Sequence, residues 1–138
     1  MLEVIPCGTL RSVIKKRAPL DSSATAFYFA NLVAGIEFLQ NAEILHRDLK
    51  PENILLGTDG YLVIADFGTA AREGDNTDWV LVGSPAYMAP ELVSIEQQSK
   101  ITYAAIDWWS SGVILYEMAT GILVSPDRLP PGKIRFLK

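Results

Sequence analysis

Hydrophobic residues recur at helical spacing in several segments of the chain. The spacing of Leu10, Val13 and Ile14 predicts a short helix that ends before Pro19. A longer helix is expected to start at residues 21–23, because Asp and Ser side chains accept the free backbone N–H groups of a first helical turn. One stripe of this helix should face the core, and it comprises Phe29, Leu32, Ile36 and Leu39.

Residues 107–120 predict a second long helix, which is apolar around most of its circumference. Such a helix belongs in the middle of a large core, and the rest of this chain offers too small a core to surround it.

Two shorter apolar runs are separated by turn residues. Residues 54–56 and 61–64 predict two strands, and the Gly-Thr-Asp-Gly stretch between them predicts the turn of a β-hairpin. Residues 68–78 are polar and contain Gly and Asp, so a loop is expected there. The predicted fold class is therefore α+β and mainly helical, with one short hairpin.

Composition and charge narrow the class of protein. Apolar residues make up 49% of the 138 residues, which excludes a disordered tail. The net charge of -4 and the lack of a dense basic run argue against nucleic acid as a partner. The four cations between residues 11 and 17 are expected to form a solvated helix face. The single cysteine, Cys7, cannot form an internal disulfide and fits a reducing compartment.

Neither a membrane span nor a signal peptide is predicted. The longest uncharged stretch, residues 22–36, includes Asn31 and several hydroxyl groups and falls short of the about 20 apolar residues that a span needs. Residues 2–10 lack the basic start and the small-residue cleavage site of a signal peptide. We therefore expect an intracellular protein, in the cytoplasm or alternatively in the nucleus.

The residues that carry chemistry flank the predicted hairpin. Asp48 and Asn53 precede its first strand and Asp66 follows its second, so the hairpin should bring Asn53 and Asp66 together. One charged and one neutral oxygen ligand suit Mg²⁺, which keeps waters and takes further ligands from a phosphate substrate. Asp48 could accept a proton from an attacking hydroxyl, and Lys50 could neutralise charge on a transferring group. These four residues therefore predict phosphoryl transfer.

Three motifs follow one another along the chain. They are residues 46–53 (HRDLKPEN), residues 66–68 (DFG) and residues 89–91 (APE). In this order and at these distances they closely resemble the catalytic loop, the metal motif and the end of the activation segment of eukaryotic protein kinases. Lys50 within the first motif looks like the Ser/Thr kinases. Residues 83–87 (GSPAY) and 107–109 (DWW) resemble the AGC group, which contains the cyclic-nucleotide-dependent kinases.

The resemblance implies a Ser/Thr protein kinase that uses ATP and Mg²⁺ and acts on Ser or Thr residues of protein substrates. Asp48 would be the catalytic base, Lys50 would contact the phosphate, and Asn53 and Asp66 would hold Mg²⁺. Residues 2–7 would form the hinge that grips adenine through backbone groups. The implied ATP-binding set comprises Glu3, Ile5, Lys50, Glu52, Asn53, Leu55 and Asp66, and Ile114 and Met118 match positions beneath the adenine ring.

Other residues would have structural or substrate-binding roles. The implied structural set comprises His46 and Phe67 in a hydrophobic stack, Asp107 as its anchor, Arg47 beside an activation-loop phosphate, Gly68 in the metal motif, and Glu91 paired with an Arg of a later helix. Ser84 would hydrogen-bond near Asp48 and Lys50. Glu52 and Glu117 are either solvated charges or, by the resemblance, meet basic residues upstream of the target Ser or Thr.

The sequence departs from the family in several places. It contains neither a Gly-rich loop before a strand nor the strand lysine that clamps the ATP phosphates, so the small lobe is absent. We expect residues 1–138 to be a partial kinase domain, running from the hinge to the central helix of the large lobe, with no Arg for Glu91. Val80 stands where these kinases usually carry a phosphorylated Thr, and Thr9 stands where a Glu often meets the substrate.

Three hypotheses remain open. In the first, the full version of this protein transfers the γ-phosphate of ATP, because Asp48, Lys50, Asn53 and Asp66 are intact. In the second, the chain is an inactive, truncated kinase-like binding module, because the small lobe is missing. An incomplete gene product would have the same sequence. We expect the isolated chain to show no turnover, since nothing in it covers the phosphates of ATP.

Overall fold

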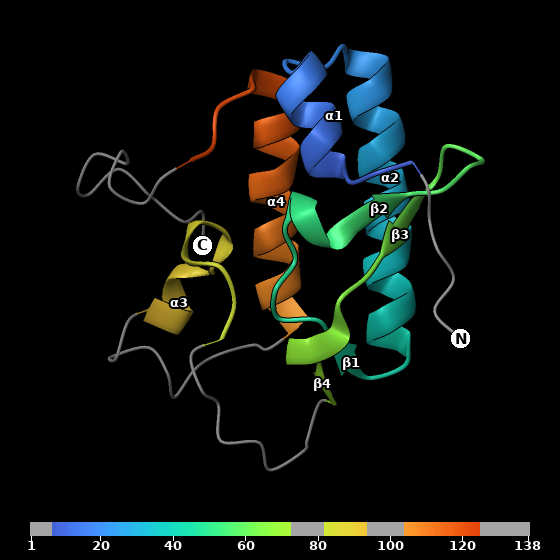
Figure 1. Cartoon of the computed structure of the whole chain (residues 1–138). Helices are drawn as coiled ribbons and strands as arrows, with labels where there is room; N and C mark the ends of the chain where they lie inside the picture. Colours follow the sequence, from blue (N-terminus) through green and yellow to red (C-terminus); the bar gives the residue numbers. More distant parts are fainter. Residues whose placement is uncertain (1–6, 73–81, 94–103, 125–138) are drawn as a thin grey trace.

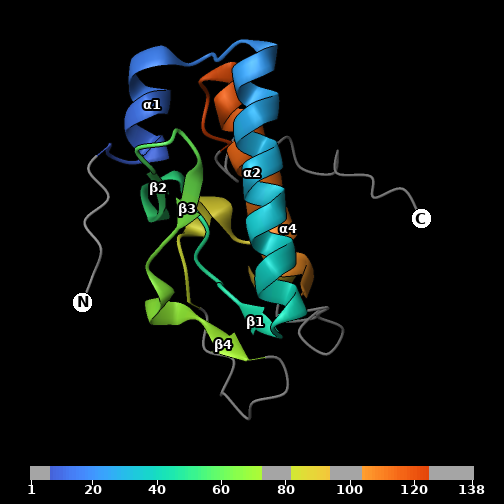
Figure 2. The same ribbon diagram turned by 90° about the vertical axis from the view of Figure 1, so that its right-hand side faces the viewer.

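Two long helices lie side by side and support the other elements (Figures 1 and 2). They are α2 (Ser22–Asn41) and α4 (Ala104–Thr120). The computed structural model describes residues 7–72, 82–93 and 104–124. Shorter helices are α1 (Leu10–Arg17) and α3 (Pro90–Val93), and single 3₁₀ turns cover Pro51–Asn53, Phe67–Thr69 and Pro85–Tyr87. No helix in these ranges is long and apolar enough to cross a membrane.

Both helices predicted in the first half of the chain form, and each begins at a side-chain cap. Thr9 accepts the N–H of Ser12 at 3.3 Å and caps α1. Asp21 accepts the N–H of Ala24 at 2.8 Å and caps α2. Such caps satisfy an N–H that has no partner inside the helix, and each contributes about 1 kcal/mol. Both predicted helices are therefore confirmed, and so is the predicted cap of α2, whereas the cap at Thr9 was not predicted.

Two pairs of short antiparallel strands lie beside the long helices. β2 (Ile54–Leu56) and β3 (Leu62–Ile64) form the predicted hairpin, and β3 packs on α2. β1 (Ile44–Leu45) and β4 (Ala71–Arg72) form the second pair. This pair was not predicted, and the loop expected over residues 68–78 is wrong at β4. Two residues per strand are too few to produce an alternating pattern in the sequence.

The core lies between the three longer helices and the hairpin. Its fully buried side chains include Leu32 and Ile36 from α2, Ile54 from β2, and Ile114 and Met118 from α4. The prediction that one stripe of the first long helix faces the core is confirmed by the burial of these α2 residues. Removing such side chains from water is the main favourable contribution to folding.

One face of α4 is buried and carries several polar side chains. Asp107, Ser110, Ser111 and Glu117 are all buried, whereas Tyr116 on the other side of the helix is 45% exposed. The described part of the chain therefore covers α4 incompletely, as the small predicted core implies. Buried polar groups require hydrogen-bond partners. Asp107 finds them in the segment that carries the predicted chemistry. Ser110 and Glu117 bond to Tyr87, and Ser111 bonds to a carbonyl of α4 itself.

Truncating the core from α2 should destabilise the whole fold. Ile36 is fully buried, whereas Phe38 on the same helix is 73% exposed. We expect Ile36→Ala to lower the free energy of unfolding by about 2–5 kcal/mol, because it removes buried methyl groups and leaves a cavity. Phe38→Ala removes a larger side chain and should change it by less than about 0.5 kcal/mol. Urea unfolding followed by circular dichroism measures both, and equal losses would contradict this description of the core.

Candidate active site

The segment that holds the predicted catalytic residues runs from β1 to β2 and is fastened to α4 by Asp107. The Asp107 carboxylate is 1% exposed and accepts the backbone N–H of His46 at 2.8 Å and of Arg47 at 3.0 Å. Burial raises the pKa of Asp107, and these two hydrogen bonds oppose the rise. Two N–H donors to one buried carboxylate fix the start of the segment against the helix.

A left-handed backbone turn follows this anchor. Arg47 has a φ of 67°, a conformation that costs a non-glycine residue about 1–2 kcal/mol. The hydrogen bonds to Asp107 hold the turn in this conformation. The guanidinium Nε of Arg47 donates to the carbonyl oxygen of Thr69 at 2.5 Å, and the Thr69 hydroxyl donates to the carbonyl of His46 at 3.0 Å. The DFG region after β3 is therefore bonded directly to the catalytic segment.

His46 connects the same two regions through its ring. Its Nδ1 accepts the N–H of Asp48 at 3.4 Å, so Nε2 carries the proton and donates to the carbonyl of Ala65 at 2.9 Å. The His46 and Phe67 rings are in contact, with centroids 5.1 Å apart. This contact is the one that the predicted stack requires. The place of both residues in a longer hydrophobic stack stays a prediction.

Asp48, Lys50, Asn53 and Ser84 form one hydrogen-bonded cluster. Lys50 Nζ donates to Asp48 Oδ2 at 2.7 Å and to Ser84 Oγ at 2.9 Å. The Asn53 amide Nδ2 donates to Asp48 Oδ2 at 3.2 Å and to the Asp48 carbonyl at 3.0 Å. Burial alone would raise the pKa of Asp48, and its interactions with Lys50 and Ser84 together outweigh burial and lower the pKa. Asp48 is therefore held as a carboxylate.

One oxygen of Asp48 has a different environment from the other. Oδ1 is buried and has no hydrogen-bond partner among the residues that the structure describes. A buried acceptor without a donor costs about 1–3 kcal/mol of stability. Such a group is a ready acceptor for a donor brought by a ligand. Of the predicted residues, Asp48 is thus the one whose geometry suits proton acceptance from a hydroxyl.

Asn53 and Asp66 fit the predicted Mg²⁺ site by their chemistry. The N–H of Ala65 donates to the carbonyl of Asn53 at 2.9 Å, so the hairpin brings the two ends together as predicted. The Asn53 amide nitrogen is engaged by Asp48, which leaves its oxygen for a cation. The exposed Asp66 carboxylate accepts the N–H of Gly68 at 3.4 Å. The described ranges hold no group of three or more His, Cys, Asp or Glu, so further ligands would be waters or phosphate oxygens.

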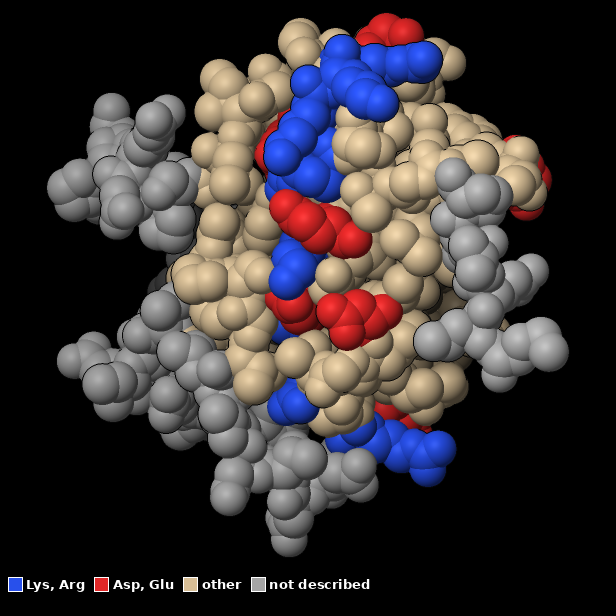
Figure 3. Space-filling view, viewed as in Figure 1, with Lys and Arg blue, Asp and Glu red and all other residues tan. Residues whose placement is uncertain are grey.

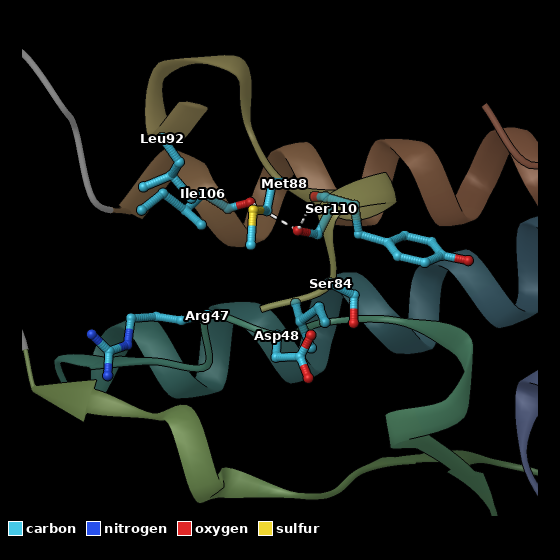
Figure 4. A pocket seen from close by; sticks show the side chains of 9 residues that line it. Arg47, Asp48, Ser84, Met88, Leu92, Ile106 and Ser110 are labelled. Carbon is cyan, nitrogen blue, oxygen red and sulfur yellow. Dashed lines mark hydrogen bonds between the residues drawn. The ribbon is translucent and has the colours of Figure 1, made fainter. Parts of the chain in front are cut away.

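A small cavity lies behind Asp48. Its volume is about 10 Å³, and its lining includes Asp48, Ser84, Met88, Leu92, Ile106 and Ser110 (Figure 4). The Ser110 hydroxyl donates to the carbonyl of Tyr87 at 2.8 Å and holds the wall of the cavity to α4. This space suits about one water and is far too small for a nucleotide.

The structure places the remaining predicted residues in three different situations. Leu55 is half-buried on β2 and forms a bridge with Thr9, and Ile114 and Met118 are fully buried in the core. Glu91 is half-buried on α3, and within the described ranges its side chain has no hydrogen bond or ion pair. The predicted hinge residues Glu3 and Ile5, and Val80, lie outside the described residues.

The sequence missed two residues of the site, Arg11 and Tyr87. The expectation of a solvated face for residues 11–17 is wrong at Arg11, which bonds Glu52, Glu117 and Tyr87. The alternative of a solvated charge is wrong for Glu117, which is 4% exposed. The only signal in the sequence for this contact was that Arg11 is a cation and that Glu52 and Glu117 are predicted site acids. Three further cations on the same helix concealed which of them would be buried.

Gly83 should tolerate no side chain, because it crosses directly over the turn at Arg47. Its φ is 111°, and an added Cβ would lie 2.6 Å from the Arg47 carbonyl oxygen. We expect Gly83→Ala to lower the free energy of unfolding by more than about 2 kcal/mol. Gly112→Ala is the matched control, because a Cβ there meets no atom within 4 Å and should stabilise α4 by up to about 1 kcal/mol. Chemical unfolding of both variants measures the difference, and an unperturbed Gly83→Ala would contradict the close crossing.

Comparison with known proteins finds relatives that are kinases. Residues 1–131 match the family described as Protein kinase domain. The human putative serine/threonine-protein kinase PRKY is 43% identical over 121 residues, which is 88% of this chain and 42% of that protein. The human cAMP-dependent protein kinase catalytic subunit PRKX is also 43% identical, over 88% of this chain and 32% of that protein. The Drosophila melanogaster cAMP-dependent protein kinase catalytic subunit 3 is 42% identical, over 91% of this chain and 21% of that protein.

This chain spans less than half the length of each of these curated relatives. The matched residues include all three motifs, namely residues 46–53, 66–68 and 89–91. The resemblance to cyclic-nucleotide-dependent Ser/Thr kinases is thereby confirmed, and the chain belongs to the protein kinase family.

Proposed function

We propose that this chain is the large-lobe part of a Ser/Thr protein kinase, from the hinge to the central helix α4. The observation that carries the proposal is the buried, unpartnered Oδ1 of Asp48 beside Lys50 and Asn53. A carboxylate kept deprotonated, with one oxygen free to accept, is what proton removal from a Ser or Thr hydroxyl requires. Relatives whose names describe them as Ser/Thr or cAMP-dependent kinases support the same reaction.

Each side chain of the cluster has one task in this proposal. Asp48 Oδ1 accepts the hydrogen bond of the substrate hydroxyl, orients it and takes its proton as the oxygen attacks. Lys50, already bonded to Asp48 and Ser84, offsets the negative charge that develops next to them. Asn53 holds Asp48 in place through its amide nitrogen. With ATP as the phosphoryl donor, Mg²⁺ held by Asn53 and Asp66 would neutralise phosphate charge.

The nucleotide and substrate assignments are part of the same proposal. Leu55, with Ile114 and Met118 beneath it, would form the floor under adenine, and the hinge would include Glu3 and Ile5. Ser84 shares Lys50 with Asp48, and Ser84, Glu52 and Glu117 would meet the protein substrate. An acceptor protein, ATP and an intracellular location follow from the proposed activity.

Removing the proposed base should abolish transfer without unfolding the protein. In the protein at its native length, we expect Asp48→Asn to reduce kcat for peptide-serine phosphorylation by about 10²–10⁴-fold, with little change in KM for ATP. Asp66→Asn should also reduce kcat and should raise the Mg²⁺ concentration that gives half-maximal transfer. The measurement is radiolabelled phosphate transfer to a serine peptide at varied Mg²⁺.

The matched control is Asp59→Asn, an identical chemical change in the hairpin turn, where Asn keeps an oxygen to accept the N–H of Tyr61. This variant should retain full activity. A kcat of Asp48→Asn within about tenfold of the wild-type value would contradict the proposed base. A native-length protein that transfers no phosphate, with or without the substitutions, would contradict the kinase proposal and favour a binding module.

A further inference from the structure

The guanidinium of Arg11 is inserted between two carboxylates that come from distant parts of the chain. Arg11 Nε donates to Glu52 Oε1 at 2.7 Å, and a second nitrogen donates to Glu117. The remaining nitrogen donates to the hydroxyl of Tyr87, which in turn donates to Glu117 Oε2 at 2.7 Å. All three nitrogens of the side chain are therefore engaged. We call Glu52, Glu117 and Tyr87 the acidic cluster.

The three charged side chains of this arrangement differ in how far they are exposed to solvent. The side chains of Arg11, Glu117 and Glu52 are 15%, 5% and 47% exposed. Burial alone would lower the pKa of Arg11, and its bonds to Glu117 and Glu52 outweigh this and raise it. Arg11 is therefore fully charged at any accessible pH. Without it, Glu117 would be a buried carboxylate with only a phenol as its partner.

The backbone explains why Arg11 alone among the cations of α1 reaches the acidic cluster. Thr9 caps the helix and places Arg11 in the first turn, and α1 packs on the 3₁₀ turn Pro51–Asn53 that carries Glu52. Lys15, Lys16 and Arg17 are exposed on later turns. Figure 3 shows Lys and Arg gathered over α1, with acidic side chains directly below them.

One of the three residues of the acidic cluster lies in the catalytic segment itself. Glu52 lies in the same motif as Asp48 and Lys50, and Tyr87 lies in the strip that begins with Ser84, which shares Lys50 with Asp48. A protein substrate whose hydroxyl reaches Asp48 therefore passes close to the cluster. Two carboxylates and a phenol that converge on one guanidinium would otherwise select an arginine of that substrate.

We infer that Arg11 is a specificity-determining residue, which fills the acidic cluster from within the chain and makes the protein indifferent to an arginine in its substrate. The inference rests on the proposed function, because it concerns the substrates of that site. Arginine in the substrate must displace a partly buried, fully bonded guanidinium that is held at high effective concentration by its own helix. Substrates are therefore recognised by other features.

Peptide binding without nucleotide tests the inference separately from phosphate transfer. The probes are serine peptides in which one arginine is moved through the positions before the serine, compared with an alanine version by fluorescence anisotropy at low and high salt. The wild-type protein should bind all of them within about twofold of one another. Arg11→Ala should bind one arginine peptide at least about tenfold more tightly than the alanine peptide, with the gain lost at high salt.

Two further variants assign the gain to the acidic cluster. Adding Glu117→Gln to Arg11→Ala should remove the preference, because the buried acceptor charge is gone. Arg17→Ala removes an exposed cation from the same helix and should leave the peptides indistinguishable. A wild-type preference for arginine, or no preference in Arg11→Ala, would overturn the inference. Neither result depends on whether the protein transfers phosphate.

If Arg11→Ala destabilises the protein, chemical rescue gives a second test of the same assignment. Millimolar ethylguanidinium should raise the melting temperature of Arg11→Ala saturably, because it replaces the missing side chain in the acidic cluster. Sodium chloride at equal ionic strength should not, and ethylguanidinium should not stabilise wild type or Arg11→Ala/Glu117→Gln. An absent or unsaturable effect of ethylguanidinium would overturn the assignment of the acidic cluster as a guanidinium site.

Discussion

The carboxylate of Asp107 accepts the backbone N–H groups of both His46 and Arg47, and the position of the catalytic segment depends on this contact. The left-handed turn at Arg47 is strained on its own. Gly83 can cross over the turn only while the carbonyl of Arg47 stays in place. Asp48 follows immediately and takes its orientation from the turn. One buried charge on α4 therefore determines where the proposed base lies.

The helix α4 holds the catalytic segment at its other end as well. Glu117 lies ten residues after Asp107, about 15 Å along the helix. Through Arg11 it is connected to Glu52 at the end of the same segment. Both carboxylates are buried, so each requires its partners to avoid an uncompensated charge. The helix interior thus supplies rigidity, while the unpartnered Asp48 oxygen between the two ends supplies the chemistry.

Local signals predicted the elements and most of the cluster. Caps, apolar spacing and turn residues predicted α1, α2 and the hairpin, and the resemblance to the family implied that Ser84 lies near Asp48 and Lys50. The pairing of β1 with β4 was not predictable, because it depends on contacts between segments far apart rather than on any two-residue pattern. Arg11 was missed for a similar reason. Four cations on one helix look alike until tertiary packing buries one of them.

Hydrogen exchange at the amides of His46 and Arg47 tests the anchor most directly. Asp107→Asn keeps the shape of the side chain, but its NH₂ group faces one of the two N–H donors, and the charge is lost. We expect protection of both amides to fall at least about tenfold relative to the wild type, since hydrogen bonds to charged groups contribute about 1.5–3 kcal/mol. The α2 amide of Ile36 should change less. Unchanged protection at His46 and Arg47 would show that the catalytic segment is held by other contacts.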